Sequence, residues 1–191
     1  MLNSLIPIIA SSGGVAVAGA YESIASATGT GSSGTITFAS IPSTYVSLQV
    51  RAIMRSSATG TSFNQSALTY NSDTGNNYTQ HGVYGDGTTV STEAYATGGY
   101  GAILLTGTVA RSGMSSGIMG TLILDIHNYA STSQYKTARS LSGGDANGTG
   151  RVVLNSGLWL STSAINSITL NAISGNWTTD TVIALYGIKG A

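Results

Sequence analysis

The chain has no cysteine among its 191 residues. This excludes a disulfide framework and any metal site built on thiolates. A chain of this length is nevertheless long enough to bury a hydrophobic core without covalent links. We therefore expect side-chain packing and strand pairing alone to hold the fold, and the length suits a single all-β domain.

Charge is also scarce. Only 7% of the residues are charged, compared with about 25% in a typical soluble domain. The seven basic and seven acidic residues balance, so the net charge is zero. A neutral chain does not attract a phosphate backbone or an anionic bilayer, and we predict no nucleic acid and no membrane as partners. A neutral protein is also poorly protected against self-association, which favours a subunit that is docked in a larger assembly.

Residues 1–20 differ from the rest of the chain. They begin with an apolar run that contains a proline, followed by the sequence SSGG at 11–14. A secretory signal is one alternative, but no lysine or arginine precedes Arg51, so the basic region of such a signal is missing. We predict that 1–20 is a docking arm and 21–191 the folded domain; a frayed terminus or an extra edge strand stays open. The residues expected to make the docking contacts are Leu2, Leu5, Ile6, Pro7, Ile8 and Ile9.

From Tyr21 onward, short segments alternate between polar and apolar residues, the period of half-buried strands. No segment shows sustained helical periodicity, and glycine and β-branched residues disfavour long helices. Glycines at 85–87, 98–99 and 143–145 predict turns. Strands are expected at 34–38, 45–53, 66–70, 78–84, 103–109, 118–128, 135–140, 152–160, 167–173 and 181–188.

About ten short strands at this spacing predict an all-β, jelly-roll-like antiparallel β-sandwich. The alternation within the strands assigns one face of each to the core. The predicted core residues are Val46, Leu48, Val50, Leu122, Leu124, Ile126, Leu158, Ile168, Leu170 and Leu185.

Two groups of polar residues could have a catalytic or metal-binding role instead of a structural one. Asp125 and His127 share one face of a predicted strand, so a serine beside them would complete a hydrolytic triad. A triad is defined by geometry and not by sequence spacing. The same two residues are equally explained as ordinary strand residues. Segment 71–76 resembles a calcium loop, but it lacks a second acid, and Asx turns account for it. His81 and His127 alone do not make a zinc site. No phosphate-binding motif occurs, and we predict no enzyme activity, no cofactor and no metal.

Aromatic residues raise the possibility of sugar binding, because aromatic faces stack on apolar sugar faces. Trp159 lies between two leucines and is expected in the core or in a subunit interface. Trp177 follows Gly175 and Asn176, so we predict that it lies in a loop and offers a surface contact. Interfaces between subunits favour the same aromatic residues, so assembly and glycan binding both remain open.

An ordered series of segments resembles a family of small β-rich proteins of tailed bacteriophages, especially phages of aquatic bacteria and cyanobacteria. The resemblance covers roughly 21–190. Its segments are YESIA at 21–25, ITFASIPSTY at 36–45, LQVR at 48–51, YNSDTGNNY at 70–78, GDG at 85–87, DIHNYA at 125–130, KTARSLSG at 136–143, GLW at 157–159 and ALYGIKG at 184–190.

The resemblance implies a structural role in the virion, assembled in the host cytoplasm, usually as a homotrimer. In the fibre-like members a long shaft precedes the module, whereas this chain has only the short apolar arm. We therefore expect a capsid decoration (cement) protein that docks on the major capsid protein and stabilises the head shell. The alternative is a tail-fibre or adhesin subunit that contacts other tail proteins or host glycans.

Overall fold

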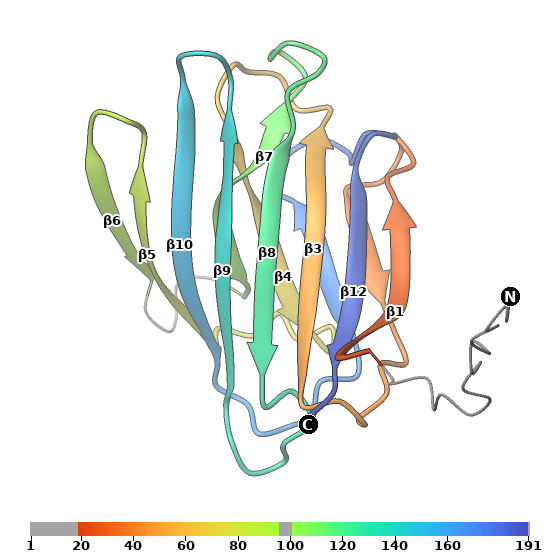
Figure 1. Cartoon of the computed structure of the whole chain (residues 1–191). Coiled ribbons are helices and arrows are strands. Elements are labelled where there is room, and N and C mark those ends of the chain that lie inside the picture. Colours follow the sequence, from red (N-terminus) through yellow and green to blue (C-terminus); the bar gives the residue numbers. More distant parts are fainter. Residues whose placement is uncertain (1–18, 96–100, 191) are drawn as a thin grey trace, which may run out of the picture.

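The structure is a computed structural model that describes residues 19–95 and 101–190. These residues form twelve β-strands and no helix (Figure 1), which confirms the all-β prediction. The strands are β1 (Tyr21–Thr28), β2 (Thr35–Phe38), β3 (Ser47–Ser56), β4 (Asn64–Tyr70), β5 (Tyr78–Gly85), β6 (Val90–Tyr95), β7 (Ile103–Arg111), β8 (Gly120–His127), β9 (Lys136–Asp145), β10 (Gly150–Trp159), β11 (Ile168–Ala172) and β12 (Val182–Ile188).

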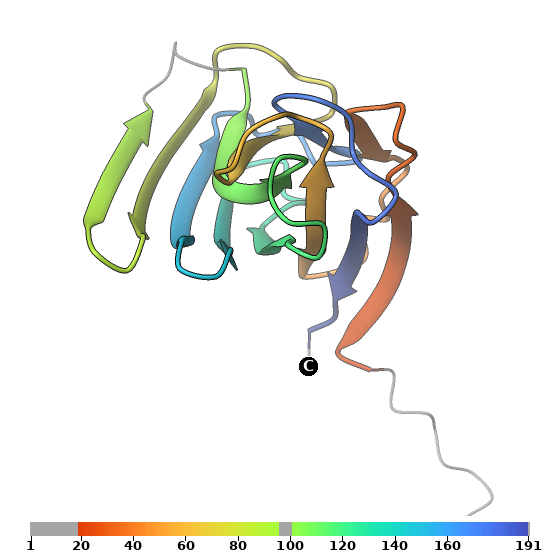
Figure 2. The ribbon, with the colours of Figure 1, turned by 90° about the horizontal axis from the view of Figure 1, so that it is seen from above.

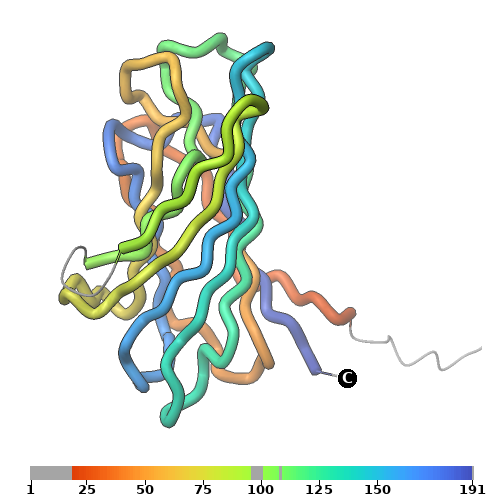
Figure 3. Tube along the Cα trace, turned by 90° about the vertical axis from the view of Figure 1, so that its left-hand side faces the viewer, coloured from red at the N-terminus to blue at the C-terminus, as the bar shows by residue number. Residues whose placement is uncertain are grey.

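The strands form two antiparallel layers, visible edge-on in Figure 3. The larger layer has the order β1-β12-β3-β8-β9-β10-β5-β6, and the smaller has the order β2-β11-β4-β7. A short parallel pairing of β3 with β7, at Arg55–Ala110 and Ser56–Arg111, joins them into one hydrogen-bonded path. Figure 2 shows the β5–β6 hairpin at one end of the larger layer.

The pairing is nested along the chain. The first strand pairs with the last, β2 pairs with β11, β3 pairs with β8 and β4 pairs with β7. The hairpins β5–β6 and β9–β10 then widen the larger sheet beyond β8. This order is consistent with a sandwich; the finer jelly-roll assignment stays a prediction.

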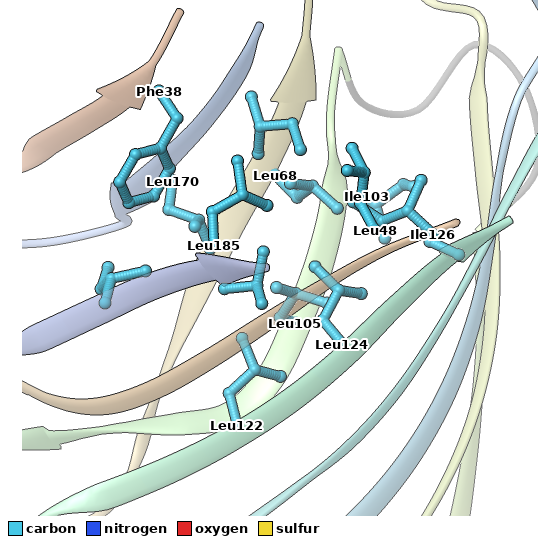
Figure 4. Packing of buried hydrophobic residues seen from close by; sticks show 14 of the residues in the cluster. Phe38, Leu48, Leu68, Ile103, Leu105, Leu122, Leu124, Ile126, Leu170 and Leu185 are labelled. Carbon is cyan, nitrogen blue, oxygen red and sulfur yellow. The ribbon is translucent and has the colours of Figure 1, made fainter. Parts of the chain in front are cut away.

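The core lies between the two layers (Figure 4). Because side chains alternate across a strand, each sheet turns every second residue towards the other. Phe38, Leu68 and Leu170 of the smaller sheet face leucines and isoleucines of the larger one. Eight of the predicted core residues are buried, namely Leu48, Val50, Leu122, Leu124, Ile126, Ile168, Leu170 and Leu185.

The core prediction is wrong for Val46, whose side chain is 64% exposed. Val46 lies before β3, which begins at Ser47. The alternation of inward and outward side chains along the strand therefore does not extend to Val46. Leu158 is only half-buried, because on β10 it is Trp159 that faces inward. A one-residue error of parity moves a side chain to the other face of the sheet.

Two strands and one turn were not predicted correctly. Strands β1 and β6 were missed as strands, and the turn expected at 143–145 is instead the end of β9. The β9–β10 turn lies at Asn147 and Gly148, which both have positive φ. An Asn-Gly pair is the favoured two-residue hairpin turn. The turn expected at 98–99 and the docking arm residues of 1–18 lie outside the described residues.

Candidate functional site

The outer face of the larger sheet carries a set of exposed apolar side chains. They lie on seven neighbouring strands, β12 to β6, and are 38% to 75% exposed. They point away from the core, because residues of the opposite parity on the same strands are buried. We call this set the apolar stripe; it consists of Ile53, Val83, Val90, Ile123, Leu141, Val152, Leu154 and Val182.

The register of the strands aligns these residues into two rows that run across the sheet. In the first row Ile123 pairs with Leu141, Leu141 with Leu154, and Leu154 with Val83. Directly opposed residues on one sheet face are close enough for their side chains to touch. The first row is therefore a continuous apolar ridge over β8, β9, β10 and β5.

The second row contains glycine in place of two side chains. Val182 pairs with Ile53 at one end, and Val152 pairs with Gly143 and with Gly85 further along. The missing side chains open a groove of about 650 Å³ on this part of the face. Its walls include Ile123, Leu141 and Val152, so an apolar ridge borders an open channel on the sheet.

Polar residues border the apolar rows on the outer face: Gln49 and Asp125 form the next row, whereas Arg51 ends the first row, directly opposite Ile123. Gln49 donates from Nε2 to Asp125 Oδ1 at 2.7 Å, and Arg51 Nε donates to Gln49 Oε1 at 2.7 Å. The Arg51 guanidinium also lies 5.3 Å from the ring centroid of Tyr21 and 5.7 Å from that of Tyr186. This polar row gives the apolar stripe a definite border.

Asp125 and His127 share the outer face of β8, as their spacing predicts. Asp125 is occupied by the amide of Gln49, and Ser47 and Thr137 are the strand partners of His127. The interpretation of both as ordinary strand residues stays a prediction, and the hydrogen bond to Asp125 comes from the neighbouring strand β3. It places Asp125 in the border of the stripe.

Asp73, in the segment that resembles a calcium loop, accepts three hydrogen bonds from donors of the protein. Its carboxylate accepts hydrogen bonds from Gly75 N at 2.8 Å, Asn77 Nδ2 at 2.8 Å and Trp159 Nε1 at 2.7 Å. Partial burial raises the pKa of Asp73, but the bonds from Asn77, Gly75 and Trp159 together hold it below its ordinary value. Asp73 therefore fixes a turn to the core, the Asx-turn alternative.

The surface role predicted for Trp177 is wrong, because its side chain is fully buried. Its indole Nε1 donates to Leu170 O at 3.4 Å, and its backbone bridges to Ser56. Gly29 packs so closely that a Cβ there would lie 2.9 Å from Trp177 Cβ. A large apolar indole gains more from burial than from exposure in a loop, and the bridge to Ser56 holds it over the core.

Trp159 is buried as expected, and it packs with Tyr70 and Tyr78. The two tryptophans therefore belong to the interior. Neither supplies an aromatic platform for sugars on the surface.

Sequence reasoning missed the apolar stripe. Its signal was present, because segments such as LIL at 122–124 and VVL at 152–154 are apolar at both parities. Continuous apolar runs are typical of strands that are covered on both faces. The predicted docking residues Leu2, Leu5, Ile6, Pro7, Ile8 and Ile9 lie outside the described residues, so their contacts stay a prediction.

Within 19–95 and 101–190, no group of three or more histidine, cysteine or acidic residues is placed to hold a metal ion. The same part of the chain contains no helix long and apolar enough to cross a membrane. Comparison with known proteins found no matching family model, no matching curated protein and no matching solved structure.

Proposed function

We propose that this chain is a structural subunit of a tailed-phage virion, and specifically a decoration protein that docks on the head shell. The apolar stripe supports the proposal more than any other feature. Large exposed apolar patches on soluble proteins mark binding surfaces, and this one spans a rigid sheet whose position the core fixes. An exposed stripe of uncharged side chains on a packed sheet suits a permanent contact with another protein.

The chemistry of the chain supports the same role. An interface buries its central residues, and burying unpaired charge is costly. The stripe residues are all uncharged; Arg51 lies beside Ile123 at the end of the first row, and Asp125 lies in the neighbouring polar row. An apolar centre with a polar rim is the usual anatomy of a protein interface. The major capsid protein is the proposed partner, with a homotrimer as the state that the phage resemblance implies.

The alternative of a glycan-binding tail-fibre or adhesin subunit has less support. It drew on Trp177 as a surface aromatic, and that side chain is buried. The stripe itself is aliphatic, and aliphatic side chains bury well against protein but do not stack on sugar rings; Tyr21 and Tyr135 are the large aromatic residues that are exposed within the described part of the chain. We therefore place the decoration role first and assign the chain no catalytic step.

Gold-labelled antibody on intact virions tests the location. We expect label spread over the head. Label confined to the tail or its fibres would contradict the decoration role and return glycan binding to first place.

A second experiment tests the docking face. The protein is added to heads that lack it, and the bound copies per head are counted. Leu141→Lys combined with Leu154→Lys should reduce occupancy at least tenfold, because two charges would be buried in the contact. Ser156→Lys, which adds a single lysine to the neighbouring polar row, is the control and should bind normally. Equal binding by both variants would exclude the stripe as the docking face.

A further inference from the structure

The apolar stripe poses a problem for the isolated subunit. A neutral protein with a continuous apolar ridge is prone to associate with itself. The chain also contains an apolar segment of its own, residues 2–10, which includes two leucines and three isoleucines and no charged residue. Stripe and segment have the same chemistry.

We infer that residues 2–10 lie across the apolar stripe of their own chain in the unassembled protein. The segment would run from β12 towards β6, with residue 10 near Val182 and residue 2 near Val90. This inference goes beyond the proposed function, since the cover would form in the isolated subunit whatever assembly the protein joins. Docking would then displace it.

The length of the segment fits the stripe. Nine extended residues span about 30 Å. Six strand spacings separate β12 from β6 in the order of the sheet, and at about 4.8 Å each they amount to about 29 Å. One extended segment therefore covers the stripe from end to end. Pro7 favours an extended backbone, and the groove beside Gly85 and Gly143 has room for side chains of the segment.

The point at which the described chain begins allows this path. Tyr21 pairs with Ile188, and Thr28 pairs with Val182 at the other end of the same two strands. A segment that leaves β1 must therefore run back by seven residues of strand, about 23 Å, to reach the stripe. Residues 11–18 span about 26 Å when extended, and the SSGG sequence at 11–14 permits the reversal.

The covalent connection favours the chain's own stripe over that of a second copy. A short flexible linker holds a tethered segment at an effective concentration in the millimolar range. At micromolar protein concentration, another molecule's segment is about a thousand times more dilute. The β1 edge, where the linker leaves the sheet, is also adjacent to β12, the near end of the stripe.

Disulfide trapping tests the inference directly, because the natural chain contains no cysteine. Residue 6 is the middle of the segment and β9 the middle strand of the stripe, so Ile6→Cys is paired with Leu141→Cys in the full chain. The matched control pairs Ile6→Cys with Thr37→Cys, an exposed position on the smaller sheet. Both proteins are oxidised at low micromolar concentration, and free thiols and mass are measured.

We expect rapid loss of thiols at monomer mass for the Leu141 pair, and at least tenfold slower loss for the Thr37 pair. Disulfide-linked dimers as the main product of the Leu141 pair would overturn the assignment to the same chain. Equal rates for the two pairs would overturn the assignment to the stripe. Circular dichroism before oxidation confirms that each variant is folded.

Deletion of residues 2–10 supplies an independent readout. Removal of the cover should increase the fluorescence of a dye that binds apolar surfaces several-fold. The same deletion in a background with Leu141→Lys and Leu154→Lys should cause little increase. An unchanged signal after the deletion alone would contradict the inference. These measurements use the isolated protein, so the outcome of the virion labelling does not affect them.

Discussion

The inner and outer faces of the larger sheet differ in what covers them, although the same strands build both. On β8, Leu122, Leu124 and Ile126 face the smaller sheet and are at most 2% exposed, whereas Ile123 between them is 44% exposed. Aliphatic side chains also line the outer face over the stripe. The comparison shows that the second sheet uses only half of the hydrophobic surface that these strands offer, and that the other half is available for a contact.

The largest effect is expected from truncation on the inner face. Leu124→Ala should lower the free energy of unfolding by about 2–5 kcal/mol, because it removes buried methyl groups and leaves a cavity between the sheets. Urea denaturation followed by circular dichroism measures the change. Ile123→Ala, one residue earlier and on the outer face, is the control and should change stability by about 0.5 kcal/mol or less. Similar losses for the two variants would mean that the faces do not differ as described.

A second contrast lies along β3, between Arg51 and Arg55. Arg51 is exposed on the outer face beside Ile123, whereas Arg55 is only 6% exposed. The Arg55 guanidinium donates to the carbonyl oxygens of Met114 at 2.7 Å, Ile118 at 2.8 Å and Ser115 at 2.9 Å. One buried cation thus satisfies several carbonyl groups of the loop between β7 and β8.

Arg55→Met should therefore destabilise the fold by roughly 2–3 kcal/mol, because those buried carbonyls lose charge-assisted donors. Arg51→Met should cost about 1 kcal/mol or less, since Arg51 is itself exposed and donates one side-chain hydrogen bond, to Gln49 Oε1. Hydrogen exchange of the amides at 112–119 separates a local effect from a global one. Protection of this loop that survives Arg55→Met would contradict the role assigned to the guanidinium.

Tyr70 provides a smaller effect that depends on pH. Burial raises the pKa of Tyr78 to about 12 and holds the pKa of Tyr70 above its ordinary value. A raised folded-state pKa gives stability that is complete below the unfolded value of about 10 and is lost as pH rises above it. We therefore expect the free energy of unfolding to decrease between pH 10 and 12.

Tyr70→Phe should make that alkaline decrease shallower. Within the described residues the buried Tyr70 hydroxyl has no hydrogen-bond partner, so its removal should change stability at pH 7 by no more than about 1 kcal/mol. Urea denaturation measures the free energy of unfolding of parent and variant across this pH range. The difference between the two removes the contributions of the other titrating groups. A large loss at pH 7, or an unchanged alkaline slope, would show that the hydroxyl has a different role.

The period of the sequence was sufficient to predict the fold class and most of the core. Leu122, Leu124 and Ile126 alternate with the polar residues Thr121, Asp125 and His127, which fix the parity of β8 although Ile123 is apolar. It was not sufficient for Val46, which lies just before its strand, or for Trp177, whose burial depends on Gly29 and Ser56, far away in the sequence. The apolar stripe depends on register between strands, and pairings such as Leu141 with Leu154 are decided by the assembled sheet.

The smallest effect on stability is expected on the outer face itself. Leu154→Ser replaces a side chain that is 47% exposed, so the free energy of unfolding should change by about 0.5 kcal/mol or less. Its effect should instead appear in contacts between molecules, because Leu154 lies in the centre of the ridge between Leu141 and Val83. Capsid occupancy should therefore fall in a protein that melts at nearly the parent temperature. A variant that binds heads normally but unfolds at a temperature several degrees lower would mean that Leu154 stabilises the sheet itself. That result would contradict the role of the outer face as a docking surface.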